Sequence, residues 1–202
     1  LSGDDEILFI ERCKAIMESN TIDVLIFEDY NKGILTPKVI SALIDIAKAN
    51  EIQTTVDPKK DHFFEYQGVD LFKPNLKELR EGLKIEVDPD NKNSLILAVE
   101  QMEMKLKNRW SLITLSEYGV FVKNKSDSTV IPAHPREIAD VSGAGDTVIS
   151  IASLLLAAGA NPVELAAIAN LGGGLVCERV GVVPIDKALL FKEAQNLIQN
   201  GI

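Results

Sequence analysis

The sequence predicts an α/β protein with a mostly parallel sheet flanked by helices. The first observation is periodicity: short β-branched apolar runs alternate with stretches whose apolar residues recur every three to four positions. Strands separated by helices indicate βαβ units, which place parallel strands under helical layers. The second is composition, because 46% of the 202 residues are hydrophobic and 25% are charged. These values are typical of a packed domain and argue against disorder.

The first elements follow from spacing and capping signals. Residues 4–19 carry an apolar stripe at helical spacing, and residues 22–27 form a β-branched run typical of a buried strand. Thr36 and Pro37 supply an N-cap and a first-turn proline. We therefore expect a helix from there to about Asn50.

The middle of the chain repeats this alternation. Strands are expected over 53–56 and 70–73, each ended by a proline-containing turn. A short helix follows Asn75. The amphipathic stretch 93–108 predicts another helix, and residues 110–115 return to a strand pattern.

The last third is mainly helical. Residues 120–122 and 129–131 suggest a hairpin, and helices are expected over 144–160, 163–180 and 186–199. In sheets of this kind, ligands bind beyond the carboxyl ends of the strands. The loops at that edge begin at Glu28, Asp57, Lys73, Ser116 and Ala139.

Charge and composition exclude several partners. The 21 basic and 30 acidic residues give a net charge of −9, so we expect no nucleic-acid binding. No apolar run reaches the roughly 20 residues of a membrane span, so no membrane partner is expected. Cys13 and Cys177 are too few for a disulfide framework or a zinc site. With no signal peptide visible, the cytoplasm is the expected compartment.

The strongest motif is DVSGAGDT over 140–147. A small-residue turn opens a long apolar helix, so the amides of Gly143 to Asp146 are expected to form an anion-binding hole. A carboxylate repels an anion bound beside it, so we expect Asp146 to have a chemical role there. The role that suits it is that of a base, which accepts a proton from a hydroxyl attacking a phosphoryl group. The competing interpretation is that Ser142 or Asp146 merely caps the helix.

Four blocks along the chain point to a family. They are KPNLKE over 73–78, TLSEYG over 114–119, DVSGAGD over 140–146, and Ala169-Asn170. In this order they resemble the PfkB/ribokinase family of carbohydrate kinases, whose second signature has the core D-x-[ST]-G-A-G-D. The resemblance extends from about Ile22 to Pro184, and it implies a ribokinase-like fold.

The resemblance also implies roles, with ATP and Mg²⁺ as cofactors. Asp146 corresponds to the catalytic base, and Gly143, Ala144 and Gly145 to the anion hole. Asn75 and Glu78 would hold the magnesium–water–phosphate cluster. The plainer interpretation of that pair is an exposed first-turn acid and its cap. The nucleotide would be bordered by Thr114, Ser116, Gly119 and Asn170.

Some of these assignments have alternatives. Ser116 stands where the family has glycine, and Asn170 is equally well interpreted as a helix-packing amide. Asp140, with Ser142, corresponds to a monovalent-cation site of some relatives. The remaining substrate candidates are loop residues at the expected sheet edge: Asp29, Lys32 and Lys59, the lysines being suited to a phosphate on the sugar.

Within the family, the segments 28–33, 56–59 and 136–147 most resemble kinases that act on a manno-heptose 7-phosphate in lipopolysaccharide precursor synthesis. The family's glycine-rich N-terminal signature is missing, and the chain starts at Leu1. We therefore expect residues 1–202 to be the C-terminal portion of one kinase domain, prone to form a homo-oligomer through its uncovered edge. The alternatives are a non-catalytic nucleotide-binding fragment and a kinase of the same fold acting on fructose, ribose or a nucleoside.

Overall fold

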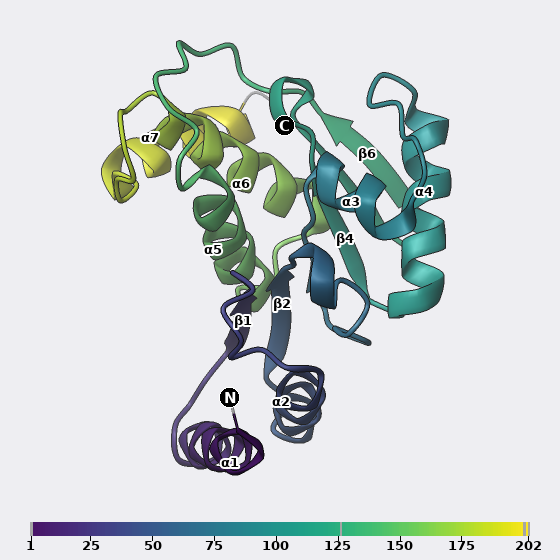
Figure 1. Ribbon diagram of the computed structural model, residues 1–202. Coiled ribbons are helices and arrows are strands. Elements are labelled where there is room, and N and C mark those ends of the chain that lie inside the picture. Colours follow the sequence, from purple (N-terminus) through teal and green to yellow (C-terminus); the bar gives the residue numbers. More distant parts are fainter. Residues whose placement is uncertain (1, 126, 200, 202) are drawn as a thin grey trace.

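The computed structural model describes residues 2–125, 127–199 and 201, and it confirms the α/β architecture. Six strands of the described residues form one sheet, in the order of the sequence (Figure 1). The first four strands are parallel, and the last two form an antiparallel hairpin against the fourth. The strands are β1 (Val24–Glu28), β2 (Gln53–Asp57), β3 (Leu71–Phe72), β4 (Trp110–Thr114), β5 (Val120–Asn124) and β6 (Asp127–Ile131).

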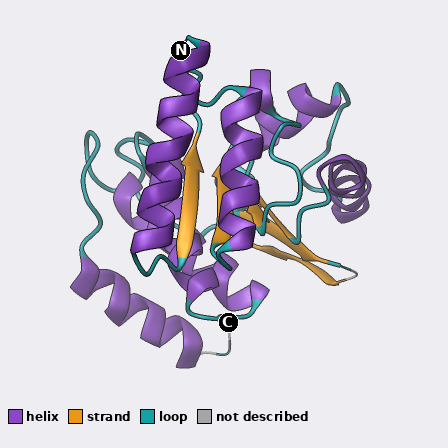
Figure 2. Cartoon of the chain, turned by 90° about the horizontal axis from the view of Figure 1, so that it is seen from below, coloured by secondary structure: helices purple, strands orange, loops and turns teal. Residues whose placement is uncertain are grey.

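Helices cover both faces of this sheet. The helices are α1 (Gly3–Ser19), α2 (Pro37–Ala49), α3 (Leu76–Leu83), α4 (Lys92–Leu106), α5 (Ala144–Ala157), α6 (Pro162–Cys177) and α7 (Lys187–Gln199), with short 3-10 turns η1 (Lys60–His62) and η2 (Ser116–Tyr118). Helices α2, α3 and α4 lie on one face and α5 and α6 on the other. Helix α1 lies beside α2, and Figure 2 shows it as the long helix that starts at the N-terminus.

The alternation of side chains along the strands divides the interior into two cores. In β3, Phe72 packs among α2, α3 and α4, whereas Leu71 faces α5 and α6. In β4, Ile113 and Leu112 divide in the same way, and all four side chains are fully buried. Each contributes about 1.5–3 kcal/mol through removal of apolar surface from water. The sheet is thus held rigidly from both sides, and its carboxyl edge is fixed.

Local signals set most boundaries as expected. The Thr36 hydroxyl accepts from the Val39 amide at 3.3 Å, and α2 ends at the Asn50 cap. Helices α5 and α6 end three residues earlier than expected, at Ala157 and Cys177. Gly159, with a positive φ, directly follows the Ala158 cap of α5, and glycine at this position terminates helices, whereas α6 ends at the Glu178 cap in right-handed helical geometry. Leu1, the residue with which the chain starts, lies outside the described residues.

Among the helices of the described ranges, none combines the length and the apolar character that crossing a membrane requires.

Candidate active site

The predicted loops meet at the carboxyl edge of the sheet. Glu28 and Asp57 are register partners at the ends of β1 and β2, and the Asp29 amide donates to the Asp57 carbonyl at 3.1 Å. Further along, Asn75 and Thr114 form a parallel bridge just beyond β3 and β4. Helix α5 packs across β1 and β2, which brings its N-terminus to the same edge.

The start of α5 has the open geometry that the glycine motif predicts. Gly143 occupies the N-cap with a φ of +79°, and no side chain caps the helix. Neither the Gly145 nor the Asp146 amide donates to a backbone carbonyl in the described part of the chain. The Ala144 amide differs from the expectation, because it donates to the Val141 carbonyl at 3.3 Å.

The capping interpretation of this motif is wrong. The Ser142 hydroxyl donates to Asp140 Oδ1 at 2.8 Å, and the Ser142 amide donates to the same oxygen at 3.0 Å. Asp140 Oδ2 accepts from the Gly181 amide at 2.9 Å. Hydrogen bonds from Ser142 and Gly181 lower the Asp140 pKa. Asp140 therefore fixes the turn before α5, and its part in binding a monovalent cation stays a prediction.

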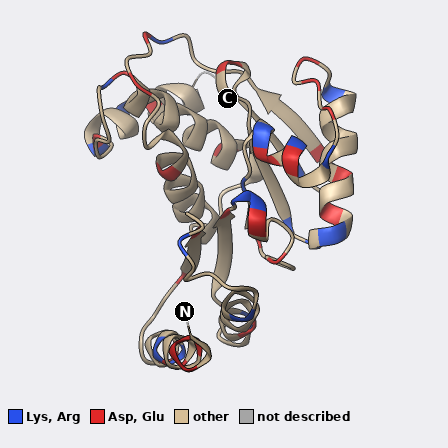
Figure 3. Cartoon of the chain, in the orientation of Figure 1, with Lys and Arg blue, Asp and Glu red and all other residues tan. Residues whose placement is uncertain are grey.

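Asp146 is an isolated charge on an otherwise apolar pair of helices. It is the single charged residue of α5, and Glu164 is that of α6, so both ribbons are almost uncoloured in Figure 3. Its carboxylate accepts a hydrogen bond from the Tyr30 hydroxyl, 2.7 Å from Oδ2. This bond, followed by burial and by the charge of Asp146, raises the Tyr30 pKa to about 12.

A buried ion pair lies against the first turn of α5. Lys73 Nζ is 3.0 Å from Asp57 Oδ1, and the two side chains are only 3% and 11% exposed. A Cβ on Gly145 would lie 3.6 Å from Asp57 Oδ2 and 3.7 Å from Lys73 Nζ, so the pair touches the helix start. Burial raises the Asp57 pKa, and the Lys73 charge opposes this effect.

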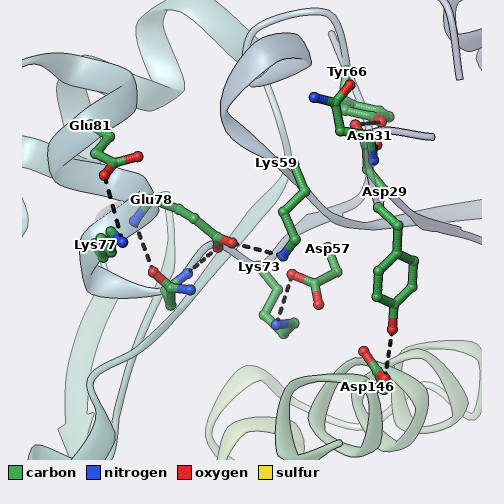
Figure 4. Close-up of polar contacts among 12 residues, drawn as sticks. Asp29, Asn31, Asp57, Lys59, Tyr66, Lys73, Lys77, Glu78, Glu81 and Asp146 are labelled. Carbon is green, nitrogen blue, oxygen red and sulfur yellow. Dashed lines mark hydrogen bonds and ion pairs between the residues drawn. The ribbon is translucent and has the colours of Figure 1, made fainter. Parts of the chain in front are cut away.

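A second ion pair lies beside the first, as Figure 4 shows. Lys59 Nζ donates to Glu78 Oε1 at 2.9 Å. Glu78 also forms a capping box with Asn75, each side chain accepting from the other's backbone amide at 2.8–2.9 Å. The pair therefore caps α3, as the plainer interpretation held, but Glu78 is buried rather than exposed. Burial lowers the Lys59 pKa, yet the bond to Glu78 and nearby carboxylates outweigh it, so the pKa is raised.

The predicted nucleotide residues share one pocket of 680 Å³ with the start of α5. Its lining includes Thr114, Ser116, Gly119 and Asn170, together with Ala144 and Gly145. The pocket thus joins two motifs that are about 30 residues apart in the sequence.

The turn that borders this pocket depends on its backbone conformation. Ser116 adopts a φ of +55°, a left-handed conformation that glycine adopts without strain. Gly119 has a φ of +90°, and a Cβ there would lie 2.1 Å from the Ile131 carbonyl oxygen. Asn170 Nδ2 donates to the Pro132 carbonyl at 3.0 Å, so its amide ties α6 to the loop after β6 as well as lining the pocket.

The three expected substrate residues do not share one environment. Asp29 is buried and accepts from the Tyr66 hydroxyl at 2.8 Å and the Asn31 amide at 2.7 Å. Lys59 is engaged by Glu78, and Lys32 is exposed. Their contact with a substrate stays a prediction.

Sequence reasoning passed over Tyr30, Asp57 and Lys73 as site residues. The signal was present, because Asp57 and Lys73 begin two of the loops at the carboxyl edge. Tyr30 lies in the loop that begins at Glu28 at the same edge, but its bond to Asp146 spans 116 residues and has no local signal.

The architecture defines the class of protein. Two solved structures share this ribokinase-like fold: phosphofructokinase-2 from Escherichia coli in complex with potassium (TM-score 0.85, 18% identity, 98% of this chain and 63% of that one) and ribokinase from Arabidopsis thaliana complexed with ribose and ATP (TM-score 0.75, 17% identity, 96% and 60%). The pfkB family carbohydrate kinase model matches residues 20–188, and the chain belongs to this family.

Curated relatives are more similar in sequence. The bifunctional protein HldE of Koribacter versatilis (strain Ellin345) is 40% identical over 165 residues, which is 82% of this chain and 34% of the relative. HldE of Campylobacter jejuni subsp. doylei is 38% identical over 183 residues, with shares of 89% and 39%. The chain therefore spans little more than a third of the curated relatives that it matches.

Proposed function

We propose that this chain is the C-terminal portion of an ATP-dependent sugar kinase domain, which transfers the γ-phosphoryl group to a hydroxyl of heptose 7-phosphate. One observation carries the proposal. Asp146 lies in the first turn of α5 beside amides that no described backbone carbonyl accepts from, and the two residues before it, Ala144 and Gly145, line a 680 Å³ pocket.

Asp146 is the proposed catalytic base. Phosphoryl transfer passes through a loose transition state, so catalysis rests on alignment and on stabilisation of charge more than on strong basicity. The amides of Gly143, Gly145 and Asp146 are the donors for the transferred group's oxygens, and the positive end of α5 adds to their effect. Ala144 shapes the turn, with its own amide directed to Val141.

The pocket is the proposed nucleotide site. Its lining from Thr114 to Gly119 suits the ribose and phosphates, and Asn170 suits the edge of the base. Ser116 and Gly119 both have positive φ, which lets the turn approach a ligand closely.

Mg²⁺ fits this edge when it is bound with the nucleotide. Within the described ranges, no group of three His, Cys, Asp or Glu side chains is arranged to hold a metal alone. Mg²⁺ instead keeps several waters and binds through substrate phosphates with one or two carboxylates. Glu78 already accepts from Lys59 and Asn75, so it suits a contact through water. The ion would neutralise phosphate charge during transfer.

The heptose 7-phosphate acceptor rests on the similarity to HldE proteins at 34–40% identity. Exposed Lys32 in the loop after β1 suits a phosphate on the sugar. Fructose, ribose and nucleosides remain the competing acceptors for the same fold.

One observation favours a second function. The chain spans only 63% of the phosphofructokinase-2 structure that shares its fold. A non-catalytic nucleotide-binding fragment, which needs a further segment for turnover, is therefore the alternative. Within the described residues β1 is an edge strand of the sheet, and strand edges are places where a second copy can pair, as the expected homo-oligomer requires.

The experiment measures ADP formation from ATP and Mg²⁺ with a panel of heptose 7-phosphate, fructose 6-phosphate, ribose and a nucleoside. We expect heptose 7-phosphate to give the highest kcat/KM. Asp146→Asn should lower kcat by about 10²–10⁴-fold while ATP binding, followed by calorimetry, survives. Turnover within about tenfold of the wild type would show that Asp146 is not the base. ATP binding without sugar-dependent ADP formation would support the fragment alternative.

A further inference from the structure

The loop after β1 presents Tyr30 between two anchored neighbours. On one side, the Asp29 carboxylate is buried and accepts from the Tyr66 hydroxyl and from the Asn31 amide. On the other side, Asn31 takes a φ of +52°, and its Nδ2 donates to Asp61 Oδ2 at 2.6 Å. A residue fixed on both sides is displayed at a defined place, so the position of Tyr30 is built into the fold.

The hydroxyl of Tyr30 is the part of the side chain that makes a specific contact. The residue is 54% exposed, so burial of the ring is not what holds it. The hydroxyl donates to Asp146 Oδ2 at 2.7 Å, a short bond of the kind that a charged acceptor produces. This bond engages one oxygen of the Asp146 carboxylate, Oδ2.

The position of Asp146 in the helix explains why it needs such a partner. The carboxylate lies in the first turn of α5, and the residue itself is partly exposed. Glu28 and Asp57 are close enough to it for the negative charges to raise the Glu28 pKa, after burial as the main cause. The charges around the carboxylate are mixed, because Lys59 and the Lys73–Asp57 pair also lie near the start of α5, and Tyr30 holds the carboxylate with a neutral donor.

We propose that Tyr30 is a positioning residue for phosphoryl transfer: its hydroxyl holds Oδ2 of Asp146, so that Oδ1 faces the acceptor hydroxyl. The inference rests on the proposed function, because it takes Asp146 as the base. The bond fixes the rotation of the carboxylate. Alignment of the base with the proton that it accepts from the acceptor hydroxyl contributes directly to the rate. The competing account is that the Tyr30 hydroxyl occupies the position of the acceptor hydroxyl beside Asp146. The Tyr30 side chain would then have to move away before the sugar binds.

Kinetics of Tyr30→Phe separate these accounts. A positioning role predicts that kcat falls by about tenfold or more, while KM for the sugar changes by less than about threefold. The control is Ser19→Ala, which removes an exposed hydroxyl at the end of α1 whose hydrogen bond goes to the Ala15 carbonyl of the same helix. Unchanged kcat in Tyr30→Phe would overturn the proposal. A lower KM with unchanged kcat would overturn it in favour of the competing account.

A titration tests the contact without any turnover. The chain has three tyrosines, so the tyrosinate absorbance of the wild type minus that of Tyr30→Phe reports Tyr30 alone. In an Asp146→Asn background, with Tyr30→Phe subtracted in the same way, we expect this transition at least about one pH unit lower, because the carboxylate's charge is gone. Coinciding transitions would show that the contact is absent in solution.

The two proposals fail in different ways. If Asp146→Asn retains turnover, the assignment of the base is wrong, whatever Tyr30→Phe does. If Asp146→Asn is inactive but Tyr30→Phe keeps the kcat of the wild type and of the Ser19→Ala control, only the role of Tyr30 is wrong.

Discussion

Replacing Lys73 with methionine tests how the site tolerates buried charge. The substitution keeps a long apolar stem but removes the ammonium group 3.0 Å from Asp57. Asp57 is then left as a buried carboxylate without its main counter-charge. Removing one partner of a buried ion pair typically costs about 3–5 kcal/mol of unfolding free energy.

The structure sets an upper limit on this cost through the protonation of Asp57. Burial already raises the Asp57 pKa above its ordinary value of 3.8, and loss of Lys73 raises it further. A carboxyl group whose pKa is higher in the folded than in the unfolded protein stabilises the fold at pH values below its unfolded pKa. This stabilisation is lost as the pH rises through the pKa of the folded protein. Neutralising Asp57 in the fold costs about 1.36 kcal/mol for each pH unit above 3.8. The limit is thus about 4.4 kcal/mol at pH 7 and about 1.6 kcal/mol at pH 5.

The assay is urea unfolding followed by the fluorescence of Trp110, the single tryptophan, which is 4% exposed. We expect Lys73→Met to lose about 3–4 kcal/mol at pH 7 and at most about 1.6 kcal/mol at pH 5. Lys77→Met is the control, because it breaks an exposed pair and should change stability by less than about 0.5 kcal/mol. Adding Asp57→Asn should remove the pH dependence of the loss. Equal losses at both pH values, or a loss below about 1 kcal/mol at pH 7, would refute the reasoning.

Two further substitutions probe the supports of the site, both measured by urea unfolding. Gly119→Ala places a Cβ 2.1 Å from the Ile131 carbonyl, so we expect it to cost at least about 2 kcal/mol more than Gly181→Ala, which shares a positive φ but meets no atom within 4 Å. Equal losses of unfolding free energy in the two variants would show that a small backbone shift removes the close contact. Tyr66→Phe leaves buried Asp29 without one of its donors, and we expect a loss of about 1–3 kcal/mol. A neutral effect would mean that water replaces the hydroxyl.

The order of elements was predictable because it depends on local patterns. The Thr36-Pro37 signal fixed the start of α2, and the β-branched runs at 120–122 and 129–131 located the hairpin of β5 and β6. The ends of α5 and α6 were less predictable, because apolar residues continue beyond the last hydrogen-bonded turn. The positive φ of Gly159, rather than a change in hydrophobicity, ends α5.

The candidate site was predictable only where a single short motif determines the local backbone conformation and its hydrogen bonds. The glycine turn before α5 and the Asn75–Glu78 capping box are both encoded within a few residues. The Tyr30 contact and the pairing of Lys59 with Glu78 depend on how separate loops converge at the sheet edge. Spacing along the chain contains no information on that convergence, so those partners could not be assigned in advance.

The strand order has a consequence for synthesis on the ribosome. Because each strand pairs with its neighbour in the sequence, the sheet can be assembled progressively as the nascent chain emerges. Asp146 lies 116 residues after Tyr30, which at about 5–20 residues per second is a delay of roughly 6–23 s. Tyr30 and the ends of β1 and β2 are therefore made well before their partner. The carboxylate proposed to act on the acceptor arrives last, when α5 docks onto strands that are already paired.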